Sequence, residues 1–253
     1  MAASTAALRG ITKQYKDFTL GPVDMTVPAG SIVGLIGENG AGKTTLLKIL
    51  CGVNRADDGT VDLLGGSPAD AATRAKIGVV FEDAFFYGSF TAAQVARSLA
   101  GMYGARWNAD SFSAYLRRFG LDAGKKLKEY SRGMRLKLSL AAALAHDPEL
   151  LVLDEATAGL DPVVRGELLD LFLEFIQDER HSIVMSSHIT ADLEQIADSI
   201  AYLHNGQLLF QENKDDLLQE YGVLHCGEDV LTSLPAGLVV FTRRGAYGCE
   251  SLV

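Results

Sequence analysis

The sequence Gly37-Glu38-Asn39-Gly40-Ala41-Gly42-Lys43-Thr44-Thr45 determines the fold that we expect of the whole chain. It fits the pattern G-x-x-x-x-G-K-[ST] of a phosphate-binding loop, or P-loop. A short apolar run, residues 31–36, precedes it, and the apolar segment 46–50 follows it. This order predicts a strand, a glycine-rich loop and a helix. The alternative is a glycine-rich turn without a ligand, but the whole pattern arises by chance only on the order of once in a hundred chains of this length.

The chemistry expected of this loop follows from its residue types. Glycines allow successive backbone N–H groups to converge on one anion. A helix that begins near Lys43 adds unpaired N–H groups and the positive end of its dipole. We therefore expect Lys43 to reach the β- and γ-phosphates of a nucleotide, and the Thr44 hydroxyl to bind Mg²⁺.

Composition limits the class of protein. The 253 residues can form one large α/β domain or two small ones. A net charge of −9 disfavours a surface that coats nucleic acid. The sequence starts without a signal-peptide pattern and holds no apolar run long enough to span a membrane. Cys51, Cys226 and Cys249 are widely spaced, as is typical of reduced thiols. We expect a soluble intracellular chain whose membrane role, if any, depends on another subunit.

Apolar patterns around the loop predict an α/β core. Pro28-Ala29-Gly30 predicts a turn, and Asn205-Gly206 predicts a hairpin. The helix that follows the loop is expected to bury Leu46, Leu50 and Val53 on one face. The remaining apolar runs predict strands at residues 18–27, 31–36, 60–64, 77–81, 150–153 and 182–186, and a helix at about 163–177.

A helical segment interrupts this core. Between residues 92 and about 128 no strand pattern occurs, and Val95, Leu99, Met102 and Tyr103 are expected to share one helical face. The segment therefore predicts a helical insertion between two halves of the α/β core.

The strand expected at residues 150–153 leads directly into Asp154 and Glu155. Ligands of parallel sheets bind at the carboxyl ends of the strands. Asp154 is therefore the candidate for holding Mg²⁺, directly or through water. Glu155 is the candidate general base for an attacking water molecule. The alternative is a solvated acidic pair without a role, and the upstream loop favours the functional interpretation.

The segment Tyr130-Ser131-Arg132-Gly133-Met134 leads into a helical pattern that ends at Pro148. Ser131 and Gly133 can present a hydroxyl group and N–H groups to an anion at the start of this helix. Alone, such a segment is more often a simple helix cap. Because it lies between the P-loop and the acidic strand end, it resembles the signature sequence of ATP-binding cassette (ABC) ATPases.

The resemblance gives candidate roles to three further residues. Ala158-Gly159-Leu160-Asp161 resembles the D-loop of the family, so Asp161 is a candidate nucleotide contact. His188 resembles the switch histidine that contacts the γ-phosphate, and joins Lys43 and Glu155 as a candidate catalytic residue. Tyr15 matches the aromatic residue that stacks on adenine. A structural histidine and a core aromatic ring are the alternatives.

The resemblance also implies the fold and its domains. ABC ATPases have an α/β P-loop NTPase core of the RecA-like type, an N-terminal antiparallel β subdomain and a helical insertion subdomain. The ABC ATPase domain then covers residues 1–210, with its core at about 1–83 and 146–210 and the helical subdomain at about 84–145. Residues 211–253 are a C-terminal extension of unknown role.

Members of this family bind ATP and Mg²⁺ and form head-to-tail dimers. The resemblance implies that Ser131 and Gly133 of one copy complete the site that residues 37–45 of the other copy begin. Such a contact closes because two copies make it twice around a two-fold axis. One chain would thus carry both halves of a site that cannot meet within itself.

The sequence departs from the family pattern in two places. After the strand at residues 77–81, Glu82 stands where the family has a glutamine, and its carboxylate makes it a candidate metal ligand. The signature has Tyr130, Arg132 and Met134 where its commonest form has Leu, Gly and Gln. This variant resembles ATPase subunits of the ABC-2 class, which includes exporters of drugs, antimicrobial peptides and amphipathic peptide toxins.

Five aromatic residues lie within ten positions: Phe81, Phe85, Phe86, Tyr87 and Phe90. We expect them to form a groove that receives a short helix of a membrane subunit. The alternative is that they pack the core of the helical insertion itself.

The sequence therefore predicts an ATP-hydrolysing subunit that powers transport through partner transmembrane (permease) subunits, on the cytoplasmic face of the cell membrane. Export of a peptide or drug is favoured, and an importer subunit is the alternative because the cassette does not encode direction. A soluble ABC ATPase that acts on ribosomes or DNA, and a P-loop kinase or GTPase, are further alternatives. The cargo is not encoded in this chain.

The replacement Glu82→Gln tests the metal role of Glu82. We expect ATPase activity within a few-fold of the unmodified chain, because an amide oxygen can replace a carboxylate oxygen at Mg²⁺. The measurement is phosphate release at saturating ATP and Mg²⁺. Complete loss of activity would show that Glu82 does not stand in for the glutamine.

Overall fold

The computed structural model describes residues 4–81, 86–235, 239, 241–245 and 248–252. The chain divides into two compact units, Met1–Gln211 and Glu212–Val253. Glu82 and Phe85, both singled out in the sequence, lie outside the described residues. Among the helices that are described, none is long and apolar enough to cross a membrane.

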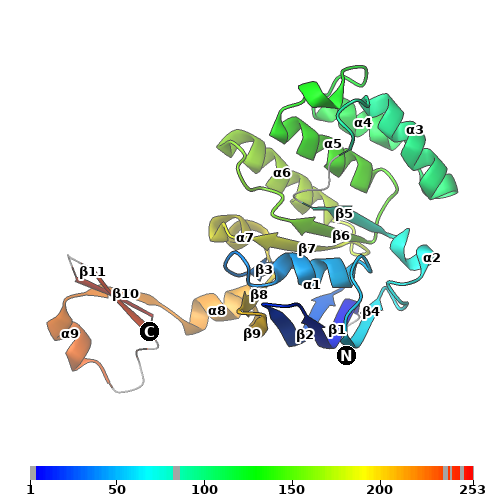
Figure 1. Cartoon of the computed structure of the whole chain (residues 1–253). Helices are drawn as coiled ribbons and strands as arrows, with labels where there is room; N and C mark the ends of the chain where they lie inside the picture. Colours follow the sequence, from blue (N-terminus) through cyan, green and yellow to red (C-terminus); the bar gives the residue numbers. More distant parts are fainter. Residues whose placement is uncertain (1–3, 82–85, 236–238, 240, 246–247, 253) are drawn as a thin grey trace. The chain divides into compact units, whose positions relative to one another are not determined.

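A six-stranded sheet lies at the centre of the first unit (Figure 1). Its strand order is β5-β6-β7-β3-β8-β9, and the first five of these strands run parallel. The Asn205-Gly206 turn joins β8 to β9 with φ angles of 47° and 79°, so the hairpin prediction is confirmed. The strands are β3 (Ile32–Ile36), β5 (Ile77–Val80), β6 (Leu150–Asp154), β7 (Ser182–Ser187), β8 (Ser199–His204) and β9 (Gln207–Asn213).

Helices cover this sheet, which explains the unbroken apolar runs of its middle strands. All five residues of β6 are buried, as expected for a parallel strand covered on both faces. Helix α1 packs against β6, and α7 packs against β3, β7 and α6. The helices of this part are α1 (Lys43–Leu50), α2 (Ala71–Arg74), α6 (Pro162–Phe175) and α7 (Thr190–Ile196).

A three-stranded antiparallel sheet of order β2-β1-β4 shares its hydrophobic core with the central sheet. Leu8, Ile11 and Val23 from this sheet pack in one cluster with Leu46 and Leu50 of α1. The expected N-terminal antiparallel sheet is therefore present and supports the helix that follows the P-loop. Its strands are β1 (Ser4–Gln14), β2 (Thr19–Pro28) and β4 (Asp58–Leu63).

The helical part lies between β5 and β6 in the sequence and has a core of its own, which confirms the predicted insertion. Val95, Phe112, Leu116 and Leu138 are buried in that core. It contains the helices α3 (Ala92–Tyr103), α4 (Ala109–Arg118) and α5 (Arg132–Leu144) and the 3₁₀ turns η1 (Gly104–Arg106) and η2 (Leu127–Glu129).

One prediction of a buried residue was wrong. Val53 is 61% exposed because α1 ends at Leu50, so the helical spacing no longer applies at position 53. Met102, which was predicted to share a helical face with Val95 and Leu99, is 78% exposed, one residue before the end of α3.

The second unit holds secondary structure that the sequence did not reveal. Three short strands form an antiparallel sheet of order β10-β12-β11. The elements are α8 (Lys214–Glu220), β10 (Val223–Cys226), α9 (Glu228–Ser233), β11 (Phe241–Gly245) and β12 (Gly248–Leu252).

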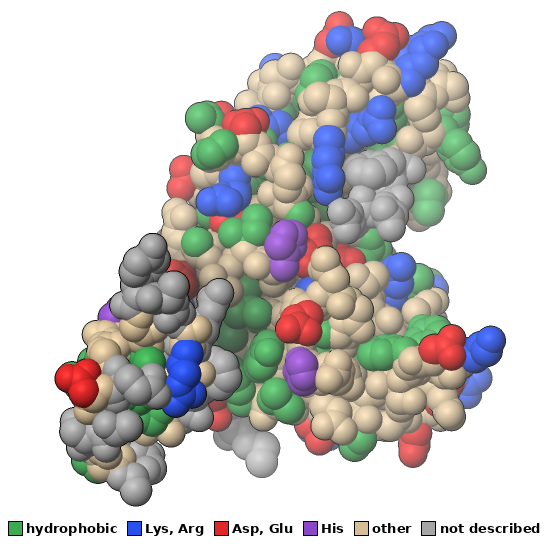
Figure 2. Space-filling view, turned by 60° about the vertical axis from the view of Figure 1, so that its left-hand side comes forward, with side chains coloured by type: hydrophobic (Ala, Val, Ile, Leu, Met, Phe, Trp, Pro, Cys, Tyr) green, Lys and Arg blue, Asp and Glu red, His purple; other side chains and the backbone are tan. Residues whose placement is uncertain are grey.

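Charge is unevenly distributed along the chain. Residues 92–144 contain ten Lys and Arg but only three Asp and Glu, whereas the whole chain has a net charge of −9. On the face shown in Figure 2, several Lys and Arg side chains lie over the helical part. The helical part is therefore basic, and the remainder of the chain is strongly acidic.

Candidate functional site

The P-loop folds as a turn between β3 and α1, as the sequence predicted. Gly42 has a φ of +108° and caps α1, and a Cβ at this position would lie 2.9 Å from the ring of Phe18. A Cβ at Gly37 would lie 2.3 Å from the carbonyl oxygen of Leu203. Gly42 is therefore required by its backbone conformation, and Gly37 is required by close packing.

A cavity of about 240 Å³ opens over this loop. Loop residues lie on one side of it, and Glu155 and Phe18 lie against it from other parts of the chain. The predicted site residues that line it are Glu38, Asn39, Gly40, Gly42, Lys43, Thr44, Thr45 and Glu155. The buried Ala41 and the tightly packed Gly37 support the loop from below.

Lys43 is nearly enclosed, with 6% of its side chain exposed. Its Nζ donates hydrogen bonds to the backbone oxygens of Gly37 at 2.7 Å and Glu38 at 3.3 Å. Nζ also lies 3.3 Å from Oε1 of Glu155, which accepts no hydrogen bond from the described residues. The lysine therefore contacts Glu155 as a charge without a directed hydrogen bond, and this contact is open to replacement by another anion.

Asp154, at the end of β6, joins the start of α1 to the end of β7. Its Oδ2 accepts a 2.8 Å hydrogen bond from the Thr44 hydroxyl, and its Oδ1 accepts a 2.6 Å bond from the Ser186 hydroxyl. The side chain is 2% exposed. Ser186 also accepts a hydrogen bond from the backbone N–H of Glu155 at 3.1 Å. The sequence did not single out Ser186, because its role depends on β6 and β7 being neighbours.

The donor set at Asp154 fits Mg²⁺. A hydroxyl oxygen and a carboxylate oxygen lie 2.8 Å apart at the edge of the phosphate-binding loop, and both are oxygen ligands that Mg²⁺ accepts. Among the described residues, no group of three or more His, Cys, Asp or Glu side chains could hold a metal ion.

Glu155 and His188 form a close pair. Nδ1 of His188 lies 2.6 Å from Oε2 of Glu155, and the backbone N–H of His188 donates to the same oxygen at 3.3 Å. Glu155 has a φ of +52°, a left-handed conformation that costs a residue with a Cβ about 1–2 kcal/mol. The acidic strand end and the histidine are thus in contact in a strained local backbone, and the contact of His188 with a γ-phosphate stays a prediction.

The signature segment lies elsewhere on the surface. Ser131 caps α5 by accepting a hydrogen bond from the N–H of Met134 at 3.2 Å, and Gly133 lies in the first turn of that helix. Asp161 caps α6 in the same way, because its side chain accepts a hydrogen bond from the N–H of Val164. Ser131, Gly133 and Asp161 do not line the cavity at the P-loop. The buried ring of Tyr130 donates its hydroxyl to the Asp122 carbonyl, which is a packing role.

Tyr15 lies beside the P-loop cavity without lining it. Its ring is 43% exposed, and its hydroxyl accepts a hydrogen bond from Asn54 at 3.3 Å. Phe18, in contrast, lines the cavity. The centroids of the Phe18 and Tyr15 rings are 6.4 Å apart. Phe18 is therefore an aromatic candidate that the sequence did not single out, and stacking of Tyr15 on adenine stays a prediction.

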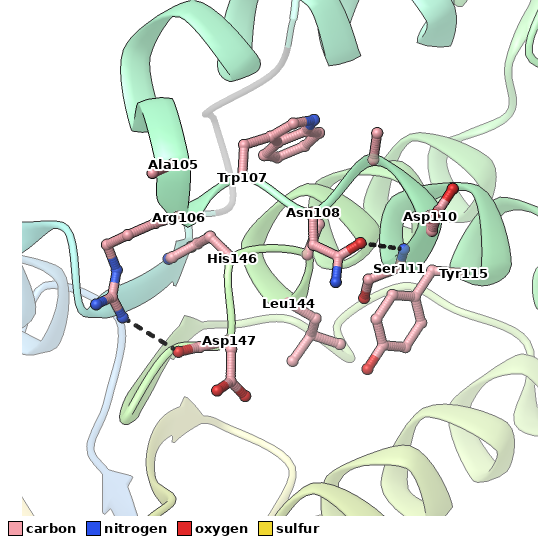
Figure 3. A pocket seen from close by; sticks show the side chains of 12 residues that line it. Ala105, Arg106, Trp107, Asn108, Asp110, Ser111, Tyr115, Leu144, His146 and Asp147 are labelled. Carbon is pink, nitrogen blue, oxygen red and sulfur yellow. Dashed lines mark hydrogen bonds between the residues drawn. The ribbon is translucent and has the colours of Figure 1, made fainter.

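A second cavity, of about 640 Å³, lies in the helical part, where α4 begins and α5 ends (Figure 3). Two of its polar side chains make hydrogen bonds to the neighbouring backbone: Arg106 donates to the Asp147 carbonyl, and Asn108 caps α4. His146 is buried, and burial lowers the pKa of its ring from the ordinary value. No predicted site residue lines this cavity, and we assign it no ligand.

Comparison with known proteins gives consistent matches. A family model described as "ABC transporter" matches residues 20–158. An ABC transporter ATP-binding protein of Synechocystis, itself uncharacterised, is 38% identical over 79% of this chain and 58% of its own length. Bacitracin transport ATP-binding protein BcrA of Enterococcus faecalis is 36% identical over 82% of this chain and 68% of its own length. Lantibiotic transport ATP-binding protein SrtF of Streptococcus pyogenes is 33% identical over 82% of this chain and 90% of its own length.

A solved structure described as an ATP-binding subunit of an ABC transporter superposes with a TM-score of 0.77 at 28% identity. The superposition covers 86% of this chain and 93% of the other. This chain spans little more than half of the Synechocystis relative but most of the lantibiotic transport protein.

Replacement of Ser186 by Ala tests whether this serine orients Asp154. We expect Mg²⁺-dependent binding of a nonhydrolysable ATP analogue to weaken by about 10- to 100-fold, because the partners of a metal ligand have effects of this size. The measurement is calorimetric titration with and without Mg²⁺. Ser182→Ala is the matched control, since Ser182 is buried at the opposite end of β7. An equal loss in both variants, or in the absence of Mg²⁺, would contradict the orienting role.

Proposed function

Because the chain belongs to the ABC transporter family, we propose that it is the ATP-hydrolysing subunit of a membrane transporter. One observation carries this proposal: a phosphate-binding loop and an acidic strand end meet at one edge of a parallel sheet, with Thr44 hydrogen-bonded to Asp154. The nucleotide phosphates would occupy the cavity above the loop, where Lys43 is the enclosed cation.

The residues at this edge of the sheet would take different roles in binding the nucleotide and the metal ion. Backbone N–H groups of residues 37–45 and the start of α1 would hold the phosphates. Lys43 would balance the charge of the terminal phosphate, and Thr44 and Asp154 would hold the metal ion. Bound Mg²⁺ supplies positive charge to the phosphate oxygens as negative charge moves to the leaving group.

Glu155 is the proposed general base. Its carboxylate lies at the edge of the same cavity and contacts both Lys43 and His188. A phosphate that binds Lys43 would compete with Glu155 for that lysine and free the carboxylate to accept a proton from water. His188 would keep Glu155 oriented while this happens, because its Nδ1 and its backbone N–H both contact Oε2.

The site on one copy is open on the side where a second copy is needed. The cavity at the P-loop is exposed, and Ser131 and Gly133 do not line it. Both residues lie at the start of α5, where a helix N-terminus can bind a phosphate. We therefore propose a head-to-tail homodimer, in which the second copy places its α5 on the phosphates of the first.

The replacement Glu155→Gln tests the general base. We expect ATP hydrolysis to fall by at least about 100-fold, because an amide cannot take the proton from water. ATP binding should persist and should hold two copies together. The measurements are phosphate release and molar mass by light scattering with ATP and Mg²⁺.

The double variant Glu155→Gln, Ser131→Ala is the matched control for the shared site. It should bind ATP but form less dimer, because the second copy has lost a phosphate contact. Continued turnover by Glu155→Gln would refute the assigned base. Equal dimerisation of the single and double variants would refute the role of Ser131 in the second half of the site.

The proposed contact with a membrane subunit lies at residues 81–90. Tyr87 is 78% exposed, whereas Phe86 and Phe90 are partly buried against the helical core. Phe81 packs against the main core, with Nζ of Lys48 at 5.6 Å from its ring centroid. These contacts support the packing alternative for Phe86 and Phe90, whereas Phe81 packs against the main core and not against that of the insertion. Among the described aromatic residues of this segment, Tyr87 is the most exposed, and it is the one that we propose to contact a partner.

Two relatives support a peptide as the cargo. They are named for transport of bacitracin and of a lantibiotic, which are peptide antibiotics. Together with the Tyr130-Ser131-Arg132-Gly133-Met134 form of the signature, this favours export by permease partners, with the chain on the cytoplasmic face of the membrane. An importer remains the competing proposal, and the identity of the permease would decide between them.

Replacement of Tyr87 by Asp tests the membrane contact. We expect recovery of the permease with the purified chain to fall by about tenfold or more, as for loss of a central aromatic contact. ATP binding should not change, since Tyr87 does not line the P-loop cavity. Leu209→Asp, at a 54% exposed position of β9, is the control. Unchanged recovery with Tyr87→Asp would place the contact elsewhere.

A further inference from the structure

Two cysteines face each other across strands of the second unit. Cys226 is the last residue of β10, and its direct partner in the antiparallel register is Cys249 of β12. Residues directly opposite in such a pair point to the same face, with Cα atoms about 4.5–5.5 Å apart. A disulfide bond needs Cα atoms about 4.4–6.8 Å apart. The register therefore satisfies the main geometric condition for a cross-strand bond.

We propose that Cys226 and Cys249 are a redox modification site, at which a reversible disulfide bond ties β10 to β12. All three cysteines of the chain are thiols in the structure, so the bond belongs to an oxidised form of the same fold. Neither the ATPase chemistry nor the transport function proposed above depends on this bond.

The small size of the second unit gives such a bond a structural effect. The unit spans Glu212–Val253, about the size below which domains usually need disulfides, metals or oligomerisation. Of its described side chains, those of Cys249 and Ser251 are buried. Ser251 contacts Thr242 across the sheet at 3.0 Å. A covalent bond would add a restraint between two strands of this unit.

The backbones approach closely at the end of the sheet where the cysteines lie. Gly248, next to Cys249, has a φ of +138°, and a Cβ at this position would lie 2.9 Å from the carbonyl oxygen of Cys226.

Because the two thiols differ in exposure, they react with an oxidant in a defined order. Cys226 is half-buried and Cys249 is 5% exposed, so a small reagent meets Cys226 first. With a low-molecular-weight disulfide as oxidant, the Cys226 thiolate attacks one sulfur, forms a mixed disulfide and releases one thiolate. The Cys249 thiolate then attacks the Cys226 sulfur and releases the second. The two protons lost by the cysteines pass to the two leaving thiolates, so one disulfide is reduced as another forms.

The test uses the full chain with oxidised glutathione, followed by alkylation of the remaining thiols and peptide mass spectrometry without reductant. We expect one cross-linked peptide pair that contains Cys226 and Cys249, with a mass loss of two hydrogen atoms. Cys51 is the internal reference: it is buried, burial followed by the charge of Asp154 raises its pKa to about 12, and it should stay a thiol. Reductant should reverse the cross-link.

Single variants complete the test. Cys226→Ser should abolish the cross-link and leave Cys249 without a glutathione adduct, and Cys249→Ser should leave a stable adduct on Cys226. Oxidation should also slow hydrogen exchange in β10 of the unmodified chain but not of either variant. A glutathione adduct that persists on Cys226 of the unmodified chain would overturn the proposal. So would a cross-link between two chains, or exchange in β10 that oxidation leaves unchanged.

Discussion

The two hydrogen bonds that Asp154 accepts, from Thr44 and from Ser186, hold the site together. They join the start of α1 to the ends of β6 and β7, which the chain reaches more than a hundred residues later. The strand order β6-β7-β3 brings these ends side by side, and the shared core of the two sheets fixes α1 over them. The position of every proposed phosphate and metal contact therefore depends on a carboxylate that is 2% exposed.

The charged side chains of the site pair with one another. Lys43 lies against Glu155, and Glu155 lies against His188. A buried lysine without a nearby anion would be costly, and Glu155 lowers this cost. The contact with Lys43 is long and lacks hydrogen-bond geometry, so a phosphate with several donors around it can replace it. The strained φ of Glu155 keeps its carboxylate within reach of both partners.

Local signals in the sequence predicted most of the site, because a P-loop and an acidic strand end are contiguous patterns. The helical insertion and the Asn205-Gly206 hairpin were predicted for the same reason. Ser186 and Phe18 were not predicted, since their roles come from packing between segments that are far apart in sequence. Val53 was misplaced because periodicity does not show where a helix ends. The strands of the second unit were not predicted, since each spans only four or five residues.

The excess of Lys and Arg over residues 92–144 gives the first unit a permanent electric asymmetry, with a basic helical part joined to an acidic core. Because the helical part carries an excess of positive charge and the rest of the unit an excess of negative charge, an external electric field gives the unit a preferred orientation. Near a charged surface this field extends over about one Debye length, near 8 Å at physiological ionic strength. The orienting effect is therefore stronger at low salt and is screened at high salt.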